Sequence, residues 1–507
     1  MSLKGFTRNF KPLEILTDEK IEAIHRATLE VLWATGIRIE HKEALNLLEK
    51  NGCKVDYTEN RVRIPPSVVE ECLRKCPSSF LIKARDPKKN LWMGGNTLYF
   101  AQSAGMSYLD VDKWEVRPAT LKEHGEACRV ADALDNLHML IGYEFYMDME
   151  GVPPCMMVLE GLASGIRNST KVQIGGFLGG CESEIFGVEM AKAVGIDLVV
   201  EICPSPPLTI YSDACEQVFT CAKAGFPIEP VSGAVMGGTG PATISGTTLV
   251  NNAELIAVTV LAQLVNPGIA VQPCDFCFPM DMRSGSPAFG SVGATMHQMV
   301  FDQYWRWLGL PTCDGTAGYS VNSKKIDFQN GYEESLGTLA GALAGDNRIC
   351  LHGQVSAELT YSDIQAVLDD DIAGWVGRFI EGVEVSDETL AVDLINEVGP
   401  IPGSYLGKEH TRKWWHKEQF MPKAADRLTY PEWSRAGKKD AIDLAKERVE
   451  EILATHKPAS LTPGQEDKIR GVLKEARDYY RKKGLISDEE WVVYAKEVLE
   501  LPDYPFV

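Results

Sequence analysis

The feature that most limits the fold of this sequence is a regular alternation of short β-rich runs and helical segments from about residue 97 onward. Such alternation is typical of βα units and of a parallel sheet. Eight runs can be counted, and helical segments follow most of them. They are Leu98–Ser103, His138–Phe145, Val172–Leu178, Pro207–Tyr211, Ile228–Val235, Ile269–Phe278, Pro311–Thr316 and Ile349–Val355. The pattern predicts an α/β fold with a closed (β/α)8 barrel, and a doubly wound open sheet is the alternative.

The pattern divides the 507 residues into three expected parts. Residues 1–95 read as an extension with two amphipathic helices and a hairpin-like stretch. Residues 96–385 hold the barrel and its active site. Residues 386–507 are charged and rich in helical periodicity, which predicts a helical C-terminal extension.

Composition narrows the classes of function. The net charge of −20 argues against a nucleic-acid partner, because phosphate binding needs a basic surface. Thirteen cysteines without a secreted-type framework favour a reducing compartment. The start of the chain is polar and the most apolar stretch, Leu255–Val265, is shorter than a bilayer requires. We therefore expect a soluble, cytoplasmic enzyme that does not enter a membrane and that forms a homo-oligomer.

The reactive groups of a βα barrel lie at the carboxyl ends of its strands. On the sixth run, side-chain alternation places Gln272, Cys274, Phe276 and Phe278 on one face. On the eighth run, the same alternation places Cys350, His352 and Gln354 on one face, with Ile349 and Leu351 turned towards the helices. His352 and Gln354 are our candidate catalytic residues, and His352 could equally be a general base, a metal ligand or a satisfied core histidine.

Aromatic side chains dominate the predicted strand ends. Aromatic faces attract cations, and rings suit a quaternary ammonium group because that group cannot donate hydrogen bonds. The alternative for any single ring is that it fills the core. The candidate substrate-binding residues are Tyr143, Phe177, Tyr211, Phe276, Phe278 and Tyr319, together with Arg283 for an anionic group.

Two motifs admit more than one interpretation. The stretch Gly233–Gly240 could cradle an anion at a helix start or form a plain turn that lets a bulky group approach the backbone, and it matches no nucleotide-binding fingerprint. Cys274 and Cys277 form a lone CxxC that would need two further zinc ligands, and on a strand the two cysteines face opposite ways. We therefore predict no metal site.

Several segments together resemble the trimethylamine methyltransferase family, and the resemblance covers nearly the whole chain. They include Ile37-Arg-Ile-Glu-His-Lys-Glu-Ala-Leu, Val62-Arg-Ile-Pro-Pro, Arg117-Pro-Ala-Thr-Leu, Ser232-Gly-Ala with Gly240-Pro-Ala-Thr, Asn252-Ala-Glu, Met280-Asp-Met-Arg-Ser-Gly and Asp327-Phe-Gln-Asn-Gly-Tyr-Glu. The resemblance implies a (β/α)8 barrel that docks a corrinoid protein over its mouth and holds no tightly bound cofactor of its own. For such a partner, Gly237 and Gly238, with Asp314 and Gly315 of the seventh run, are the candidate corrinoid-binding residues. Trimethylamine-specific members carry pyrrolysine around the region that corresponds to 322–331.

This chain contains only the twenty standard residues, so it resembles the branch without pyrrolysine, whose members demethylate betaines. The resemblance implies glycine betaine as the favoured substrate, with proline betaine and carnitine as relatives, and cobalamin carried by a partner protein as the methyl acceptor. A quaternary amine leaves as a neutral molecule, so the barrel must supply positioning and desolvation and no proton. The alternatives are a zinc barrel that uses Cys274, Cys277 and His352 to methylate a thiol, and a betaine-binding protein without catalysis.

Overall fold

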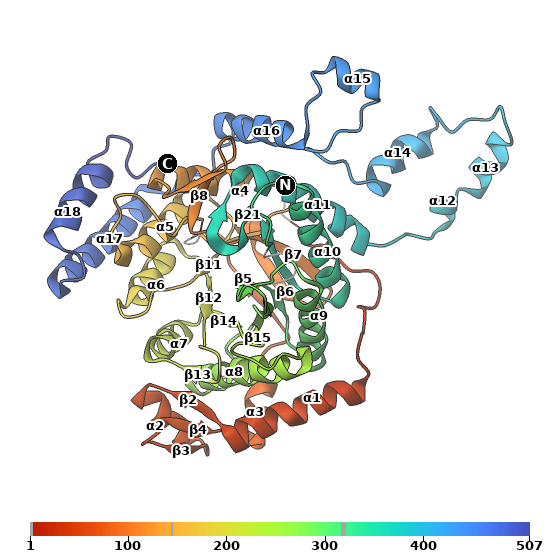
Figure 1. Ribbon diagram of the computed structural model, residues 1–507. Coiled ribbons are helices and arrows are strands. Elements are labelled where there is room, and N and C mark those ends of the chain that lie inside the picture. Colours follow the sequence, from red (N-terminus) through yellow and green to blue (C-terminus); the bar gives the residue numbers. More distant parts are fainter. Residues whose placement is uncertain (1–3, 143–144, 316–320) are drawn as a thin grey trace.

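The computed structural model describes residues 4–142, 145–315 and 321–507, and its centre is a closed barrel of parallel strands (Figure 1). Among the described residues, eight strands pair side by side in chain order, and the last pairs with the first. They are β7 (Thr97–Gln102), β10 (Met139–Leu140), β11 (Val172–Gly175), β12 (Leu198–Ile202), β14 (Ile228–Ser232), β16 (Cys274–Asp275), β19 (Cys313–Asp314) and β20 (Arg348–His352). The predicted (β/α)8 barrel is confirmed, and the open sheet is excluded by the β20–β7 pairing.

One of the eight predicted runs was assigned wrongly. The fourth barrel strand is β12, whereas Thr209–Ile210 forms β13, which pairs with β2 (Ile37–Ile39) in a small sheet outside the barrel. The sequence of β12 is apolar at alternate positions: Leu198, Val200 and Ile202 pack outward, and Val199 packs into the barrel. Strands that are buried on both faces form short apolar runs rich in β-branched residues. The sequence of β12 has this composition, which identifies it as the fourth barrel strand.

The helices surround the barrel and extend beyond it. Those before and around the barrel are α1 (Asp18–Glu30), α2 (Lys42–Lys50), α3 (Pro66–Lys75), α4 (Leu121–Ala133), α5 (Pro154–Asn168), α6 (Ser183–Val194), α7 (Ser212–Ala224), α8 (Ile244–Val265), α9 (Val292–Trp307), α10 (Phe328–Ala344) and α11 (Asp363–Ile380). Those after it are α12 (Asp387–Leu390), α13 (Val392–Val398), α14 (Glu409–Glu418), α15 (Tyr430–Arg435), α16 (Ala441–Thr455), α17 (Pro463–Lys483) and α18 (Asp488–Tyr494).

Helix α8 is long and apolar enough to cross a membrane by length and composition, but 78% of its most apolar window is buried within the protein. It packs against α1, α3, α7 and α9 as well as β14. A helix that is apolar on all sides is typical of the core of a large protein. Its apolar character is therefore accounted for by burial.

A hairpin closes the amino-terminal end of the barrel. It consists of β5 (Ser79–Ile82) and β6 (Leu91–Gly94), and its buried side chains share one cluster with the barrel interior. The N–H of Lys83 donates to Asp197, directly before β12, and the amide of Gln272, before β16, lies 3.2 Å from the sulfur of Met93. The carboxyl ends of the strands therefore form the open end.

Most of the remaining strands form small sheets outside the barrel, and the first of them, Phe6–Thr7, pairs antiparallel with β7 instead. They are β1 (Phe6–Thr7), β3 (Lys54–Asp56), β4 (Arg61–Arg63), β8 (Ser107–Asp110), β9 (Glu115–Arg117), β15 (Val235–Met236), β17 (Phe278–Asp281), β18 (Ser286–Pro287), β21 (Gln354–Val355) and β22 (Thr360–Tyr361). Among them, β15 pairs with β17, and β17 pairs with β18 as a hairpin. This β15–β17–β18 sheet stands on the carboxyl ends of β14 and β16, beside the open end.

The interior of the barrel contains an ion pair and a layer of thiols. Arg348 of β20 donates to both carboxylate oxygens of Glu229 on β14, at 2.6 and 2.5 Å, and both side chains are fully buried. Above this pair, the thiol of Cys313 interacts with those of Cys274 and Cys350. Burial raises the pKa of the Cys274 thiol well above its usual value, so the layer is neutral and packs as a set of small apolar groups.

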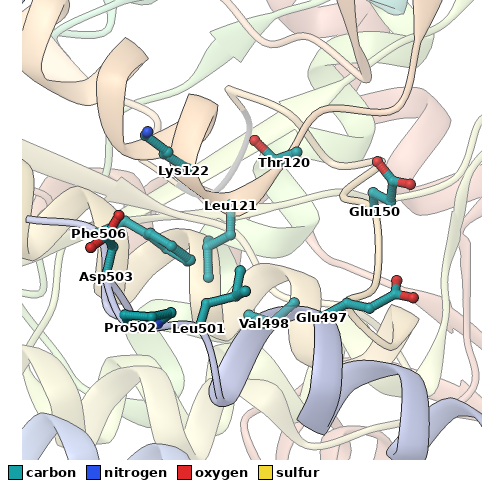
Figure 2. Close-up of a pocket in the computed structure, with 10 residues that line it drawn as sticks. All are labelled: Thr120, Leu121, Lys122, Glu150, Glu497, Val498, Leu501, Pro502, Asp503 and Phe506. Atoms are coloured by element: carbon teal, nitrogen blue, oxygen red, sulfur yellow. The ribbon is translucent and has the colours of Figure 1, made fainter.

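The end of the chain packs against the outside of the barrel. Figure 2 shows a cavity of about 370 Å³ between the start of α4 and the last residues, where Leu121, Val498, Leu501 and Phe506 meet. The carbonyl of Phe506 accepts a hydrogen bond from the Asn168 amide at 3.2 Å. The residues that line this cavity include none of the predicted site residues, so the active site must be sought at the open end.

Candidate active site

Phe276 directly follows β16 and turns its ring towards the interior at the open end. Its predecessor Asp275 points outward, to His297 of α9, and Cys274 points inward, so alternation brings the ring of Phe276 inward. The neighbouring strands supply glycines on both sides of the ring. A β-carbon on Gly233 would lie 3.1 Å from one ring atom, and a β-carbon on Gly315 would lie 3.6 Å from another. Gly233 therefore leaves space that the ring occupies, whereas a β-carbon on Gly315 would make only an ordinary contact with the ring and would instead crowd the carbonyl oxygen of Asp275 at 2.8 Å.

Three phenylalanines form a cluster at this end. The centroids of Phe276 and Phe278 are 5.5 Å apart, those of Phe278 and Phe289 are 4.3 Å apart, and those of Phe276 and Phe289 are 5.9 Å apart. The ring of Phe276 is only partly buried. Phe289 was missed by the sequence reasoning, because it lies between β18 and α9 and not at a strand end. An apolar residue just before a helix start was the available signal.

Glu201 is a second residue that the sequence reasoning missed. On β12 it shares a face with Val199, which packs in the barrel interior, so its carboxylate is directed to the open end. It lines a cavity of about 200 Å³ together with Met147, Phe177 and Gln217. The run that contains Glu201 was not recognised as a strand, and for this reason the residue was not considered. A carboxylate at the mouth adds negative potential that favours a cation.

A buried polar network holds the strands behind the mouth. Asp275 accepts hydrogen bonds from His297 Nδ1 at 2.7 Å and from the Asn251 amide at 2.9 Å. Glu254 of α8 accepts from the Ser232 hydroxyl at 2.5 Å and from the N–H of Leu208 at 2.6 Å. Burial raises the pKa of Glu254 to about 7, although both hydrogen bonds favour the carboxylate. The network fixes β14 and β16 to α8 and α9.

The expected orientation of His352 is wrong. The register between β20 and β7 shifts between Cys350 and His352, so Leu351 is an extra residue of a β-bulge. Cys350 faces inward and Ile349 and Leu351 face the helices, as expected. Beyond the bulge, however, His352 also faces the helices, and its Nε2 lies 3.7 Å from a carboxylate oxygen of Asp370 on α11. The bulge thus separates His352 from the inward face of the strand.

Gln354 remains close to the open end. It is fully buried in β21, and its Oε1 accepts a hydrogen bond from the N–H of Val321 at 3.3 Å. Among the residues that the structure describes, the Nε2 atom of Gln354 has no hydrogen-bond partner. A buried amide donor without a partner is costly, so this atom is suited to an acceptor on a ligand.

The other predicted residues of the substrate site are scattered. Phe177 directs its ring to Gly187 of α6 and also lines the cavity beside Glu201. Tyr211 is 46% exposed at the start of α7, because its run belongs to the small outer sheet. Arg283 lies on the exposed turn between β17 and β18, where its guanidinium pairs with Asp281 at 2.7 Å. Tyr143 and Tyr319 lie outside the described residues.

The residues predicted for corrinoid binding lie in three places. Gly237 and Gly238 form the turn after β15, against Met282 and Met280 of the β17–β18 hairpin. Gly315 adjoins Phe276 at the mouth. Asp314 instead faces α10, where a β-carbon on Gly341 would lie 3.1 Å from its carboxylate, and its charge contributes to the raised pKa of Asp302.

The zinc alternative loses its ligand set. The three proposed ligands are all described, and they point in different directions. Cys274 faces the barrel interior, the Cys277 thiol contacts Ser232, and His352 faces Asp370. Two other groups of potential ligands are close together: Glu229 with Cys274 and Cys313, and Asp275 with Cys277 and His297. Both carboxylate oxygens of Glu229 already accept hydrogen bonds from Arg348. The 2.7 Å between Asp275 and His297 is a hydrogen bond, since two ligands of one tetrahedral zinc ion would lie roughly 3.3 Å apart.

Comparisons of the sequence with known proteins point to one family. Residues 1–479 match the family model described as trimethylamine methyltransferase (MTTB). The chain is 31% identical over 478 residues to trimethylamine methyltransferase MttB of Desulfitobacterium hafniense, and the match covers 92% of this chain and 94% of that protein. It is 30% identical to the glycine betaine methyltransferase of Desulfitobacterium hafniense strain Y51, over 91% and 96% of the two chains. Among solved structures, the monomethylamine methyltransferase MtmB of Methanosarcina barkeri matches with a TM-score of 0.47 and 13% identity, over 92% of this chain and 88% of that one.

Proposed function

Since the chain belongs to the trimethylamine methyltransferase family, we propose that it moves a methyl group from a small quaternary amine to the Co(I) centre of a corrinoid protein. Glycine betaine is the favoured substrate, and proline betaine and carnitine are the nearest alternatives. The observation that carries the proposal is the aromatic cluster of Phe276, Phe278 and Phe289 at the open end, and the carboxylate of Glu201 on β12 lies at the same end of the barrel. Rings and one negative charge suit a cation that cannot donate hydrogen bonds.

The transfer requires no acid from the protein when the substrate is quaternary. The bond between nitrogen and one methyl carbon breaks, its electron pair stays on nitrogen, and the amine leaves neutral. The methyl carbon forms its new bond to cobalt with the electron pair of Co(I). The protein then has to hold the methyl group in line and exclude water. Phe276 positions the ammonium group, and Glu201 offsets its charge before the transfer.

A betaine also carries a carboxylate, which needs a donor. Gln354 is our candidate, because its buried Nε2 has no partner among the described residues. We no longer assign a substrate contact to His352, since it faces Asp370, and we propose that it positions β20 instead. Arg283 stays a candidate only through movement of its hairpin, because its side chain is 90% exposed and paired with Asp281.

The partner and location of the enzyme follow from the same proposal. The corrinoid protein docks over the open end, where Gly237, Gly238 and the β17–β18 hairpin line the rim. The enzyme works in the cytoplasm, which is supported by thirteen free cysteines and by the burial of α8. No nucleic acid or membrane takes part.

A methyl-transfer assay with free cob(I)alamin tests the substrate. We expect methylcobalamin from glycine betaine or a close relative, and none from dimethylglycine or trimethylamine, because a tertiary amine lacks a viable leaving group. The product should be the amine with one methyl group fewer, and the reaction should stop there. Equal rates with trimethylamine and the best betaine would overturn the substrate assignment.

The two alternative functions predict different outcomes, each with its own measurement. Tight binding of a betaine, measured by calorimetry, without transfer to cob(I)alamin would indicate a binding protein. One equivalent of bound zinc per chain and methylation of a thiol would indicate the zinc enzyme.

A further inference from the structure

Residues 383–439, which we call the arm, leave the barrel after α11 and return to it at α16. In Figure 1 the helices α12, α13 and α14 stand clear of the barrel, and the chain comes back through α15. The structure describes the whole arm, and within it only Trp414 and Ala424 are buried. Ordering a segment costs free energy, because conformational entropy is lost, and the burial of side chains normally offsets this cost. The arm has almost no buried side chains that could do so.

The arm exposes large apolar side chains. Ile401 is 95% exposed, Leu406 is 86% exposed and Val383 is 82% exposed, and Val385, Val392 and Tyr430 are also mostly exposed. Soluble monomers rarely expose apolar groups in such density, and where they do the surface marks an interaction site. The arm therefore needs a cover that its own barrel does not provide.

An apolar groove lies at the base of the arm. Trp375 and Phe379 of α11 stack with their centroids 5.6 Å apart, although the two side chains are 50% and 46% exposed. They line a groove of about 770 Å³ with Phe10, Val383 and Phe420. Because Val383 and Phe420 belong to the arm, the groove and the arm form one continuous surface.

The charge of the arm indicates what covers it. The arm has nine acidic and nine basic side chains, whereas the whole chain carries −20, so the net charge lies entirely outside the arm. Within the arm the charges pair with each other, as in Lys408 with Glu397 at 2.7 Å, Lys417 with Glu384 at 3.2 Å, and Lys413 with Glu388. Two copies of a chain with this charge repel each other, and they repel least where they meet through the neutral arm. A basic partner protein would be attracted to the acidic remainder instead.

We propose that the arm and its groove form a two-fold interface with a second copy of this chain. In such an interface the same surface serves both partners, so the arm of each copy covers the Trp375–Phe379 groove of the other. Contact through the arm buries Ile401 and Leu406, which the described part of their own chain leaves almost fully exposed. The proposal does not depend on the substrate or on the methyl acceptor.

Sedimentation equilibrium of the full chain at several concentrations tests the interface, without substrate or corrinoid. The test variant is Ile401→Asp with Leu406→Asp, and the matched control is Val492→Asp with Val493→Asp, which adds the same charge to exposed apolar positions of α18. We expect the wild type and the control to form dimers or larger even-numbered assemblies. The arm variant should be monomeric, or its dissociation constant should rise at least tenfold.

Hydrogen exchange of the wild type keeps the proposal testable if the arm variant fails to fold. Exchange in the arm and in α11 around Trp375 should slow as the protein concentration rises. A wild type that is monomeric at all concentrations overturns the proposal, as does unchanged assembly of a folded arm variant. A monomer whose arm becomes protected only when a corrinoid protein is added also overturns it, and assigns the arm to that partner.

Discussion

Phe276 shows how one side chain depends on its neighbours in space. Its ring fits at the open end because Gly233, after the adjacent strand β14, has no side chain to crowd it. Phe278 and Phe289 pack on its edge and limit its rotation. The ring is thus held in one orientation before a ligand arrives, which lowers the entropy cost of binding.

Replacing Phe276 by leucine should weaken the binding of a quaternary amine by about 0.5–2 kcal/mol, because an aliphatic group keeps most of the apolar contact and loses the attraction of the ring for a cation. Phe276→Tyr is the matched control, since it keeps the ring, and it should retain most of the affinity. Binding is measured by calorimetry with glycine betaine. Equal affinities of the leucine variant and the wild type would remove Phe276 from the substrate site.

Glu254 shows the cost of burying a carboxyl group. Its pKa is raised to about 7 in the folded protein, from an ordinary value of 4.5, chiefly by burial. Between these two values the unfolded chain releases the proton while the folded chain retains it. The free energy of unfolding therefore falls as pH rises through this window, by about 3 kcal/mol at most.

The variant Glu254→Gln removes this dependence, because the amide does not ionise: its oxygen can accept from the N–H of Leu208 and its NH2 group can donate to the Ser232 hydroxyl oxygen. We expect the urea midpoint of the wild type to fall, relative to that of the variant, as pH rises from about 5 to about 8. Urea unfolding of both proteins at several pH values measures the difference. If the two proteins show parallel pH dependence, Glu254 does not hold its proton in the fold.

At the scale of the element, the bulge in β20 decides which residues reach the open end. Without the bulge, Cys350 and His352 would share the inward face, as alternation predicts. With it, His352 turns to Asp370 on α11. Burial would raise the pKa of Asp370, but His352 and then Lys423 hold it below its usual value. A strand, a helix and a lysine of the arm, Lys423, therefore meet at one carboxylate.

We expect His352→Gln to keep methyl transfer within about tenfold of the wild type, because the side chain contacts Asp370 and lies away from the aromatic cluster. It should lower stability by about 1–3 kcal/mol, since Asp370 stays buried with a weaker partner. The pH dependence of kcat is the measurement that a purely structural role leaves unchanged. Complete loss of activity in a stable variant, with loss of a step near an imidazole pKa, would instead make His352 a catalytic acid or base.

At the scale of the whole molecule, the C-terminal helices are part of the barrel wall. Arg477 of α17 pairs with the fully buried Glu160 of α5 at 3.1 Å, and the hydroxyls of Tyr494 and Tyr504 donate to the same carboxylate. Arg167, also of α5, forms two hydrogen bonds with Glu466, both of 3.0 Å. Removal of these helices would leave charged groups of α5 without partners.

The variant Arg477→Met should lower the free energy of unfolding by about 3–5 kcal/mol, the usual effect of removing one partner of a buried ion pair. The double variant Arg477→Met with Glu160→Gln should recover part of the loss, because no buried charge is then unpaired. Urea unfolding measures both. A loss below about 1 kcal/mol in the single variant would mean that the C-terminal helices are only loosely joined to the barrel.

The sequence by itself determined the fold class and the family. Eight βα units repeat along the chain, and seven of the eight predicted runs contain barrel strands, because apolar β-branched runs and helical periodicity are local properties of the chain. The resemblance to the trimethylamine methyltransferase family, based on segments such as Val62-Arg-Ile-Pro-Pro, is confirmed by the family match. The inward orientation that alternation predicts for Cys274 and Cys350 is also confirmed. Cys313, for which no orientation was predicted, faces inward as well.

Only the tertiary structure decided which residues meet. The choice between β12 and β13 as the fourth barrel strand depends on pairing between strands, because both runs have the local composition of a strand. Because β12 is the barrel strand, Glu201 becomes a candidate site residue and Tyr211 does not. The direction of His352 depends on a bulge, which arises from the register of two strands that are about 250 residues apart in the chain and has no local signature. The space for Phe276 depends on Gly233, which follows another strand. Alternation predicts which face a side chain takes, but a register shift of one residue reverses that prediction, and register is a property of the assembled barrel.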